Sequence, residues 1–193
     1  MRTLGHRLLF ALAGGLIALA GSAARAETPS YVGAKKCKAC HLKQFQSWEQ
    51  TKMAKSFELL KAGAYADAKK KMNVDPQKDY THDEKCLPCH TTGYGKPGGF
   101  VSLEKTPELV GVQCESCHGP GGEYLKQGYM TLVNREYKRA ELLKVGLVVP
   151  MAETCTLQCH NPKSPFVTKD SVFNFEERKK KGTHEHIALK YEH

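Results

Sequence analysis

The eight cysteines of this chain fall into four close pairs, and a histidine directly follows the second cysteine of every pair. Three motifs read Cys-x-x-Cys-His, whereas the fourth has one further residue and reads Cys-x-x-x-Cys-His. The motifs consist of Cys37, Cys40 and His41; Cys86, Cys89 and His90; Cys114, Cys117 and His118; and Cys155, Cys159 and His160. Because no cysteine lies outside them, one chemistry has to account for all eight thiols.

Three chemistries compete for such pairs. Disulfides suit an even number of cysteines in an exported protein, and paired Cys-x-x-Cys units can build zinc sites, but both leave the four histidines without a role. Covalent haem attachment uses every residue, because two thiols one helical turn apart reach the vinyl groups on one haem edge and the next residue offers its imidazole to the iron. The sequence therefore predicts four covalently bound haem c groups, with the eight cysteines as attachment points. The predicted proximal ligands are His41, His90, His118 and His160.

The fourth motif differs from the others in its spacing. Three residues separate Cys155 from Cys159, so the additional residue has to bulge or the local helix has to unwind. The alternatives are that one thioether forms or that no haem binds there. We expect attachment, because Cys159 and His160 keep the adjacent positions that proximal ligation requires.

The N-terminus has the form of a secretion signal. Arg2 and Arg7 precede an apolar run over residues 8–20, which is short for a bilayer span, and Ala24-Arg25-Ala26 has the form that signal peptidase recognises. We expect residues 1–26 to be a cleaved signal and residues 27–193 to be a tetrahaem cytochrome c domain in the periplasm; cleavage after Ala23 and an uncleaved anchor are the alternatives. Export agrees with haem attachment, which takes place outside the cytoplasm.

The mature chain of 167 residues is polar and poor in aromatic residues, so an apolar core of ordinary size is hard to build from it. We expect a mainly α fold of short helices and loops wrapped around the four haems, with few or no strands. Hydrophobic spacing predicts helix over 34–60 and 65–72, mostly helix over 123–145, a glycine-rich loop over 91–99, and a helical tail from 173 that breaks at Gly182.

The net charge is +9, or +6 for the mature chain, because the signal holds three arginines and no acidic residue. A basic surface often indicates nucleic acid or anionic lipid. Here the two propionates of each haem offset many lysines, so nucleic acid is not expected and a membrane is reached only through a partner.

The sixth ligand at each iron comes from the remaining histidines or from methionine, which raises the reduction potential relative to histidine. The candidates in the mature chain are His82, His184, His186, His193, Met53, Met72, Met130 and Met151. Spacing does not choose among them. If His184 and His186 lie on a helix, they diverge by about half a turn and cannot share one iron.

The sequence resembles the tetrahaem cytochrome c-554 family of ammonia-oxidising bacteria. The resemblance rests on residues 35–41, 46–48, 75–81, 111–121 and 184–186, and on the spacing of the first three motifs. It implies a mostly helical fold with haems in closely stacked pairs. It also implies a periplasmic electron shuttle supplied by hydroxylamine oxidoreductase.

The resemblance further implies two histidine ligands at three irons and no sixth ligand at the second. Met53 falls where a family histidine ligates the fourth haem, and Tyr129, beside Met130, falls where another ligates the first. His184 matches the distal ligand of the third haem. Since two family histidines are missing here, we expect Met53, Met130 and His184 as iron ligands, with Tyr129 or an open site competing at the first haem. The electron donor of the family, hydroxylamine oxidoreductase, is therefore not assigned to this chain.

Three functions fit these features. The first is an electron carrier, a monomer or small oligomer that docks redox proteins at exposed haem edges. The second is an enzyme that reduces a small ligand such as nitric oxide or another nitrogen oxide at the haem of His90. The sequence shows no acid–base group there, although His82 could serve as one. The third is a subunit of an assembled cytochrome complex or filament.

Overall fold

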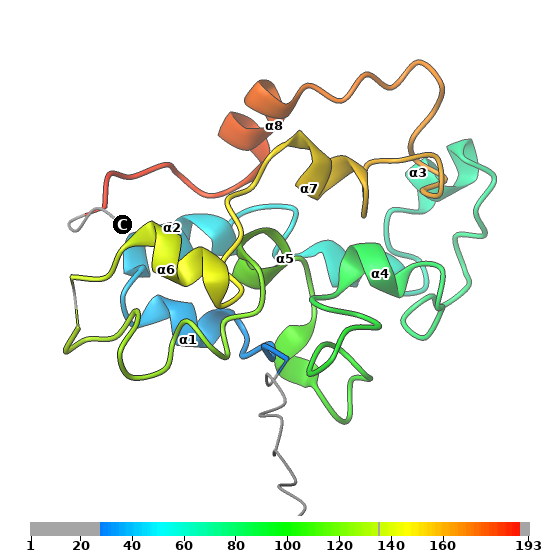
Figure 1. Ribbon diagram of the computed structural model, residues 1–193. Helices are drawn as coiled ribbons and strands as arrows, with labels where there is room; N and C mark the ends of the chain where they lie inside the picture. The colour runs from blue at the N-terminus through cyan, green and yellow to red at the C-terminus, as the bar shows by residue number, and fades with distance from the viewer. Residues whose placement is uncertain (1–27, 135, 190–193) are drawn as a thin grey trace, which may run out of the picture.

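The computed structural model describes residues 28–134 and 136–189, and the expected signal segment and His193 lie outside them. Short helices alternate with longer turns (Figure 1). The α-helices are α1 (Ala34–Lys38), α2 (Leu42–Glu49), α3 (Ala66–Lys71), α4 (Leu87–His90), α5 (Cys114–His118), α6 (Arg139–Lys144), α7 (Ala152–Thr156) and α8 (Phe175–Gly182). The 3₁₀ helices are η1 (Ser56–Leu60) and η2 (Pro107–Leu109).

The mainly α expectation is confirmed. Among the described residues there is no strand, and extended pairing is confined to one bridge between Thr91 and Val110. The Thr92 amide donates to the Leu109 carbonyl at 2.8 Å, and this bond closes the glycine-rich loop over the end of α4. No described helix has the length and apolar character needed to cross a membrane.

The expected continuous helix over residues 34–60 is wrong, because the segment is divided into α1, α2 and η1. The backbone of His41 (φ −109°, ψ 46°) leaves the helix directly after the first motif. At the end of α2, the Thr51 hydroxyl donates to the Trp48 carbonyl and accepts from the Ala54 amide, which turns the chain. The Trp48 indole also donates to the Val112 carbonyl at 2.9 Å, so a contact remote in sequence fixes the direction of α2.

The expected helix over 123–145 is also wrong, because only α6 is helical there. Residues 123–134 form turns around Tyr124, whose hydroxyl donates to the Gly119 carbonyl at 3.0 Å. Gly128 has φ 100°, a value that an α-helix does not use. Near 65–72 the expected helix is present as α3, and Asn73, with φ 56°, leaves the helical conformation directly after Met72.

The tail forms α8 and ends at Gly182, as expected. The Asn174 side chain accepts from the Glu177 amide at 3.1 Å and caps the first turn. Acidic residues occupy that turn and lysines occupy the last one, which is the favourable arrangement for the helix dipole. Since α8 buries no residue, these local effects support a helix that packing alone does not specify.

The apolar core consists of two small clusters. The first joins η1, α4 and η2 and contains Phe57, Leu60, Leu87, Phe100 and Leu109. The second, which we call the tyrosine cluster, contains Tyr124, Tyr137 and Leu142. Many large apolar side chains between these clusters are exposed, among them Leu157 and Met151. The protein residues therefore enclose only part of the interior by themselves.

A buried carboxylate joins the beginning of the described chain to the third motif. Glu115 is 1% exposed, and its oxygens accept from the amides of Val32 (3.0 Å), Gly33 (2.7 Å) and Gly121 (2.6 Å). Beside it, the Gln113 side chain accepts from the Ala34 amide at 2.7 Å. These bonds satisfy free amides at the start of α1 and hold α1 against α5.

We predict that Glu115→Ala destabilises the haem-loaded protein by about 3 kcal/mol or more, because it leaves three buried amides without an acceptor. Urea unfolding followed by far-UV circular dichroism measures this loss. Glu49→Ala is the matched control, since Glu49 is exposed on α2, and it should change the free energy of unfolding by less than about 0.5 kcal/mol. Equal effects of the two substitutions would contradict the role given to Glu115.

Candidate haem sites

Each motif lies at a short helix, and α5, which carries the third motif, lies near the middle of the molecule with α1 and α7 on opposite sides of it (Figure 1). The third motif is wholly contained in α5, while the first begins in α1 and the fourth begins in α7. In the first motif the His41 amide donates to the Cys37 carbonyl at 2.9 Å, which closes one α-turn across the motif. One turn brings both thiols and the imidazole to neighbouring positions.

The stretched fourth motif keeps the same closure. Helix α7 ends at Thr156, and the His160 amide then donates to the Cys155 carbonyl at 2.9 Å across five residues. The turn is thus one residue wider than in the first motif, and the unwinding predicted from the spacing takes up the additional residue. His160 leaves the turn from the same hydrogen-bonded position relative to the first cysteine as His41 does.

Two motif histidines are oriented by carbonyls from distant segments. The Nδ1 atom of His90 donates to the Ser56 carbonyl on η1 at 2.6 Å. The His118 ring is hydrogen-bonded to the backbone of Val148. A separate bond, from the Val148 amide to the His118 carbonyl at 2.9 Å, joins the two backbones at the same place. An imidazole that donates from Nδ1 presents the lone pair of Nε2, as a haem ligand must.

The environment of these rings also fits metal ligation. Burial lowers the pKa of His90 and of His118, and a hydrogen bond to backbone opposes the shift in each case. Neutral imidazole is the form that binds a metal. Gly119 has φ 76°, and a Cβ atom there would collide with the Gly146 carbonyl, so glycine allows this close approach beside His118.

Cysteines of different motifs lie in contact. The Cys37 thiol donates to Cys114, which raises the pKa of Cys37 and lowers that of Cys114. The Cys159 thiol donates to Cys89 and lowers the pKa of Cys89 to about 7. The sulfur of Cys89 also lies 3.5 Å from the Gln158 carbonyl. The first motif is therefore beside the third, and the second is beside the fourth.

A further contact connects these two pairs. Burial raises the pKa of Cys117 to about 11, and the nearby Cys155 thiol acts in the same direction. The third motif is thus also close to the fourth. Taken together, the thiols place the motifs in the spatial order first, third, fourth, second, which differs from their order along the chain.

A cavity of about 400 Å³ lies between α5 and the fourth motif. Its lining includes Cys117, Pro120, Val148, Leu157 and Gln158. Its volume and mainly apolar wall suit a cofactor. Since it is lined by an attachment cysteine and by residues of two motifs, the side chains present fit a haem face there.

All eight cysteines are free thiols. Within the described part of the chain, no three His, Cys, Asp or Glu side chains are close enough together to hold a metal ion by themselves. The donors fit a metal carried in a macrocycle, to which the protein adds only axial ligands.

His184 lies opposite a motif histidine. Its ring centre is 6.3 Å from that of His118, and the ring planes are inclined by 29°. Metal–imidazole bonds are about 2 Å long, so imidazoles on opposite sides of one metal place their ring centres roughly 6 Å apart. The Nδ1 atom of His184 lies 2.8 Å from the Glu185 carbonyl, and the Glu185 amide donates to the Ser47 hydroxyl on α2 at 2.9 Å. The tail is therefore held where His184 faces the third motif.

The condition under which His184 and His186 would diverge, a helix that contains both, is not met. The chain is not helical after Gly182, and the two ring centres are 5.1 Å apart. His186 points toward the end of α8, where its Nε2 lies 3.2 Å from the Lys179 carbonyl. Only His184 is thus presented to the motif.

The two candidate methionines occupy partly buried positions. Met53 lies in the turn after α2, and its carbonyl accepts from the Val112 amide at 3.1 Å. Met130 and Tyr129 pack on the tyrosine cluster. Ligation by either methionine stays a prediction.

The tyrosine cluster adds one residue, Tyr137, to the surroundings of the first motif that the sequence analysis did not identify. Burial raises the pKa of Tyr137, and the Cys40 thiol acts in the same direction, which places Tyr137 beside the first motif. No spacing rule connects two residues so far apart in the chain. Tyr129, Met130 and Tyr137 therefore share the surroundings of the first haem site.

His82 lies at the second motif but on the surface. It is exposed, its Nδ1 is 3.1 Å from the Thr81 hydroxyl, and it lines a cavity of about 150 Å³ together with Leu87 and Phe100. The cavity is large enough for a small ligand and too small for a haem.

Comparisons with known proteins agree with this geometry. The family described as cytochrome c554 and c-prime matches residues 36–119. Cytochrome c-554 of Nitrosomonas europaea is 37% identical over 206 residues, covering 92% of this chain and 87% of that protein. The solved structure of reduced cytochrome c554 from the same organism superposes with a TM-score of 0.70 at 35% identity, covering 86% of this chain and 89% of the other. The chain therefore belongs to the cytochrome c554 family of multihaem c-type cytochromes, with covalently attached haem c as its cofactor and four motifs that fit four haems.

Proposed function

We propose that this protein is a periplasmic electron carrier whose four haems are attached at the eight motif cysteines, with His41, His90, His118 and His160 as proximal ligands. The observation that carries the proposal is the closeness of thiols from different motifs: Cys37 is hydrogen-bonded to Cys114 and Cys159 to Cys89, and Cys155 lies near enough to Cys117 to raise its pKa. Haems attached at these positions would lie next to one another in a continuous chain, so an electron could pass from haem to haem, as a carrier requires. The expected signal over residues 1–26 would direct the chain to the periplasm.

The chain's contribution to electron transfer is positional. Haem c supplies a reversible one-electron couple, and no substrate bond forms or breaks. The Ser56 carbonyl fixes the His90 ring, and the Val148 backbone fixes His118. The carboxylate of Glu115 keeps the first and third motifs together. Rigid ligands change little when the charge on the iron changes, so reorganisation stays small.

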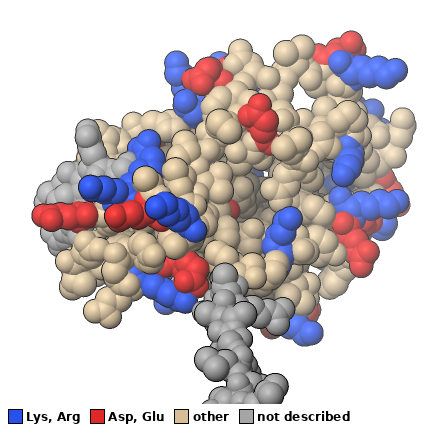
Figure 2. Space-filling model, in the orientation of Figure 1, with Lys and Arg blue, Asp and Glu red and all other residues tan. Residues whose placement is uncertain are grey.

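Redox partners would dock through charged surface. Figure 2 shows lysines, arginines and acidic residues interspersed around one face, whose middle is mainly uncharged. On α8, Lys179 and Lys181 pair with Glu176 and Glu177 at 3.3 and 3.0 Å, so part of the positive charge is neutralised locally. Exposed ion pairs of this kind favour brief, salt-sensitive encounters over stable complexes.

A second function, reduction of a small ligand, has one observation in its favour. The cavity beside His82 adjoins Leu87 of the second motif, the motif for which the family resemblance implies no sixth ligand. Carbon monoxide added to the reduced protein distinguishes the two functions. A spectral change followed by turnover of a nitrogen oxide supports the enzyme, whereas absence of binding to any haem excludes it.

We predict that the purified protein carries four haems and that the fourth motif forms both thioethers. In Cys155→Ser or Cys159→Ser, one vinyl group in four haems should remain unsaturated, which shifts part of the pyridine haemochrome band to longer wavelength. Cys114→Ser in the unstretched third motif is the matched control and should give the same partial shift. A wild-type mass corresponding to three haems, or an unchanged spectrum in both fourth-motif variants, would refute attachment at that motif.

We also predict His/Met ligation at the fourth haem through Met53. Near-infrared magnetic circular dichroism of the oxidised protein should show a His/Met band that Met53→Ala weakens by the contribution of one haem, together with a lower reduction potential if histidine or water replaces the sulfur. Met72→Ala is the control, because Met72 is a partly buried residue at the end of α3. If the wild-type protein shows no His/Met band, neither Met53 nor Met130 is a ligand.

A further inference from the structure

One lysine of α3 is buried while its neighbours are exposed. Lys69 is 4% exposed, whereas Lys70 and Lys71 on the same helix are exposed. Lysine is almost never this buried unless an acidic side chain compensates its charge. Lys69 therefore differs from the rest of the lysine run, and the groups around its ammonium decide how its charge is stabilised.

The Lys69 ammonium has polar partners but no ion pair. Its Nζ donates to the Lys61 carbonyl at 2.9 Å and lies 5.3 Å from the centre of the Tyr80 ring. Among the described residues, no carboxylate lies within ion-pair distance of it; Asp79, which is nearby, directs one oxygen at the amide and hydroxyl of Thr81. The positive charge of Lys69 is thus left without a direct counter-charge.

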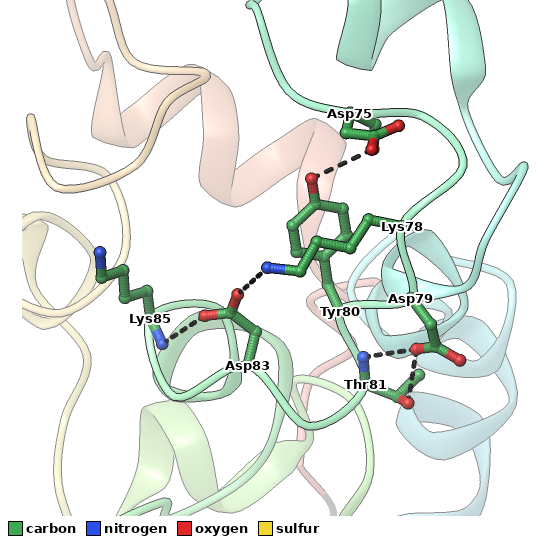
Figure 3. A network of polar contacts seen from close by, with 7 residues as sticks. All are labelled: Asp75, Lys78, Asp79, Tyr80, Thr81, Asp83 and Lys85. Atoms are coloured by element: carbon green, nitrogen blue, oxygen red, sulfur yellow. Dashed lines mark hydrogen bonds and ion pairs between the residues drawn. The ribbon is translucent and has the colours of Figure 1, made fainter.

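Lys78 also lies over the Tyr80 ring, but its environment differs from that of Lys69. Its ammonium lies 4.7 Å from the Tyr80 ring centre, but it is exposed and pairs with Asp83 at 3.0 Å (Figure 3). Figure 3 also shows that Asp83 accepts from the Lys85 amide and that Tyr80 donates to the Asp75 carbonyl, so local hydrogen bonds hold this segment together. Of the two lysines on Tyr80, only Lys69 keeps an unpaired charge.

Two sets of bonds place Lys69 beside the second motif. The Ser56 carbonyl, which holds His90, belongs to the first residue of η1, and the Lys61 carbonyl, which holds Lys69, belongs to the residue that directly follows η1. On the other side, the Asp83 amide donates to the Tyr80 carbonyl at 3.0 Å.

The second set of bonds continues into the motif itself. The Cys86 amide donates to the Asp83 carbonyl at 2.8 Å. Tyr80 and Cys86 also both pack against the core cluster that contains Leu60 and Leu87. Lys69 is therefore held beside the start of the second motif.

We propose that the Lys69 ammonium is a fixed positive charge that raises the reduction potential of the second haem and so draws the transferred electron to it. The inference rests on the attachment of that haem at Cys86, Cys89 and His90. Reduction adds one electron, supplied by a redox partner or by a neighbouring haem, and a nearby cation stabilises the added negative charge. Because the cation is buried, salt screens it little.

The test is a redox titration of the purified tetrahaem protein by visible absorption and electron paramagnetic resonance. The component altered in a His90→Gly variant identifies the second haem. Lys69→Gln removes the charge and keeps a donor for the Lys61 carbonyl, and Lys69→Met replaces it with an apolar chain of similar length. Lys69→Arg keeps the charge. Lys70→Gln is the matched control, with the same change in net charge on the exposed face of α3.

We expect Lys69→Gln and Lys69→Met to lower the equilibrium constant for reducing the second haem about tenfold, a shift of about 59 mV for a one-electron couple. The shift should persist from 0.1 to 1 M salt, whereas any smaller shift in Lys70→Gln should vanish at 1 M. Lys69→Arg should keep the wild-type potential.

Three outcomes would overturn the inference: equal shifts from Lys69→Gln and Lys70→Gln, a shift spread evenly over all four haems, or a shift in Lys69→Arg as large as in Lys69→Gln. If mass spectrometry finds no haem at Cys86 and Cys89 in the wild-type protein, the proposed attachment itself is wrong. If all four haems are attached and no shift specific to Lys69 occurs, only the present inference fails.

Discussion

The buried carboxylate of Glu115 is the interaction on which the arrangement of the motifs depends. It belongs to the third motif, yet it accepts from amides 82 and 83 residues earlier in the chain and from the glycine turn that follows α5. A polar group of this kind is favourable only when all of its bonds are made. The start of α1, helix α5 and the turn at Gly121 therefore adopt one mutual position, and the thiols of Cys37 and Cys114 meet as a result.

The motifs and their backbone geometry are the part of the structure that sequence predicts best. Cysteine spacing indicates the haem chemistry and the widened turn at Cys155, and composition indicates a helical fold with little apolar core. The failures have a common cause. Within 34–60, the direction of α2 depends on the bond between Trp48 and Val112, which spans 64 residues. Local periodicity carries no information about such contacts.

The candidate iron ligands show the same division between local and long-range information. Proximal histidines follow from the motif alone, whereas the carbonyl that orients His90 comes from η1 and has no recognisable pattern. His184 was identified by resemblance, and its position 6.3 Å from His118 depends on an anchor between Glu185 and Ser47 that spans 138 residues. No sequence pattern identified Tyr137, because it comes close to the first motif only when the chain folds back on that motif. Buried Lys69 was equally hidden within a lysine run that reads as a solvated face.

The spatial order of the motifs has a consequence for biogenesis. An exported chain emerges from its N-terminus, so the second motif leaves the translocon before the third and fourth. Its neighbour in the folded protein is the fourth, and the contact between Cys89 and Gln158 spans 69 residues. The second site therefore stays incomplete until the last third of the chain has been delivered, and closure of such distant contacts is slow. In the proposed export of this chain, haem attachment would therefore act on an open polypeptide, and compaction would be the last step.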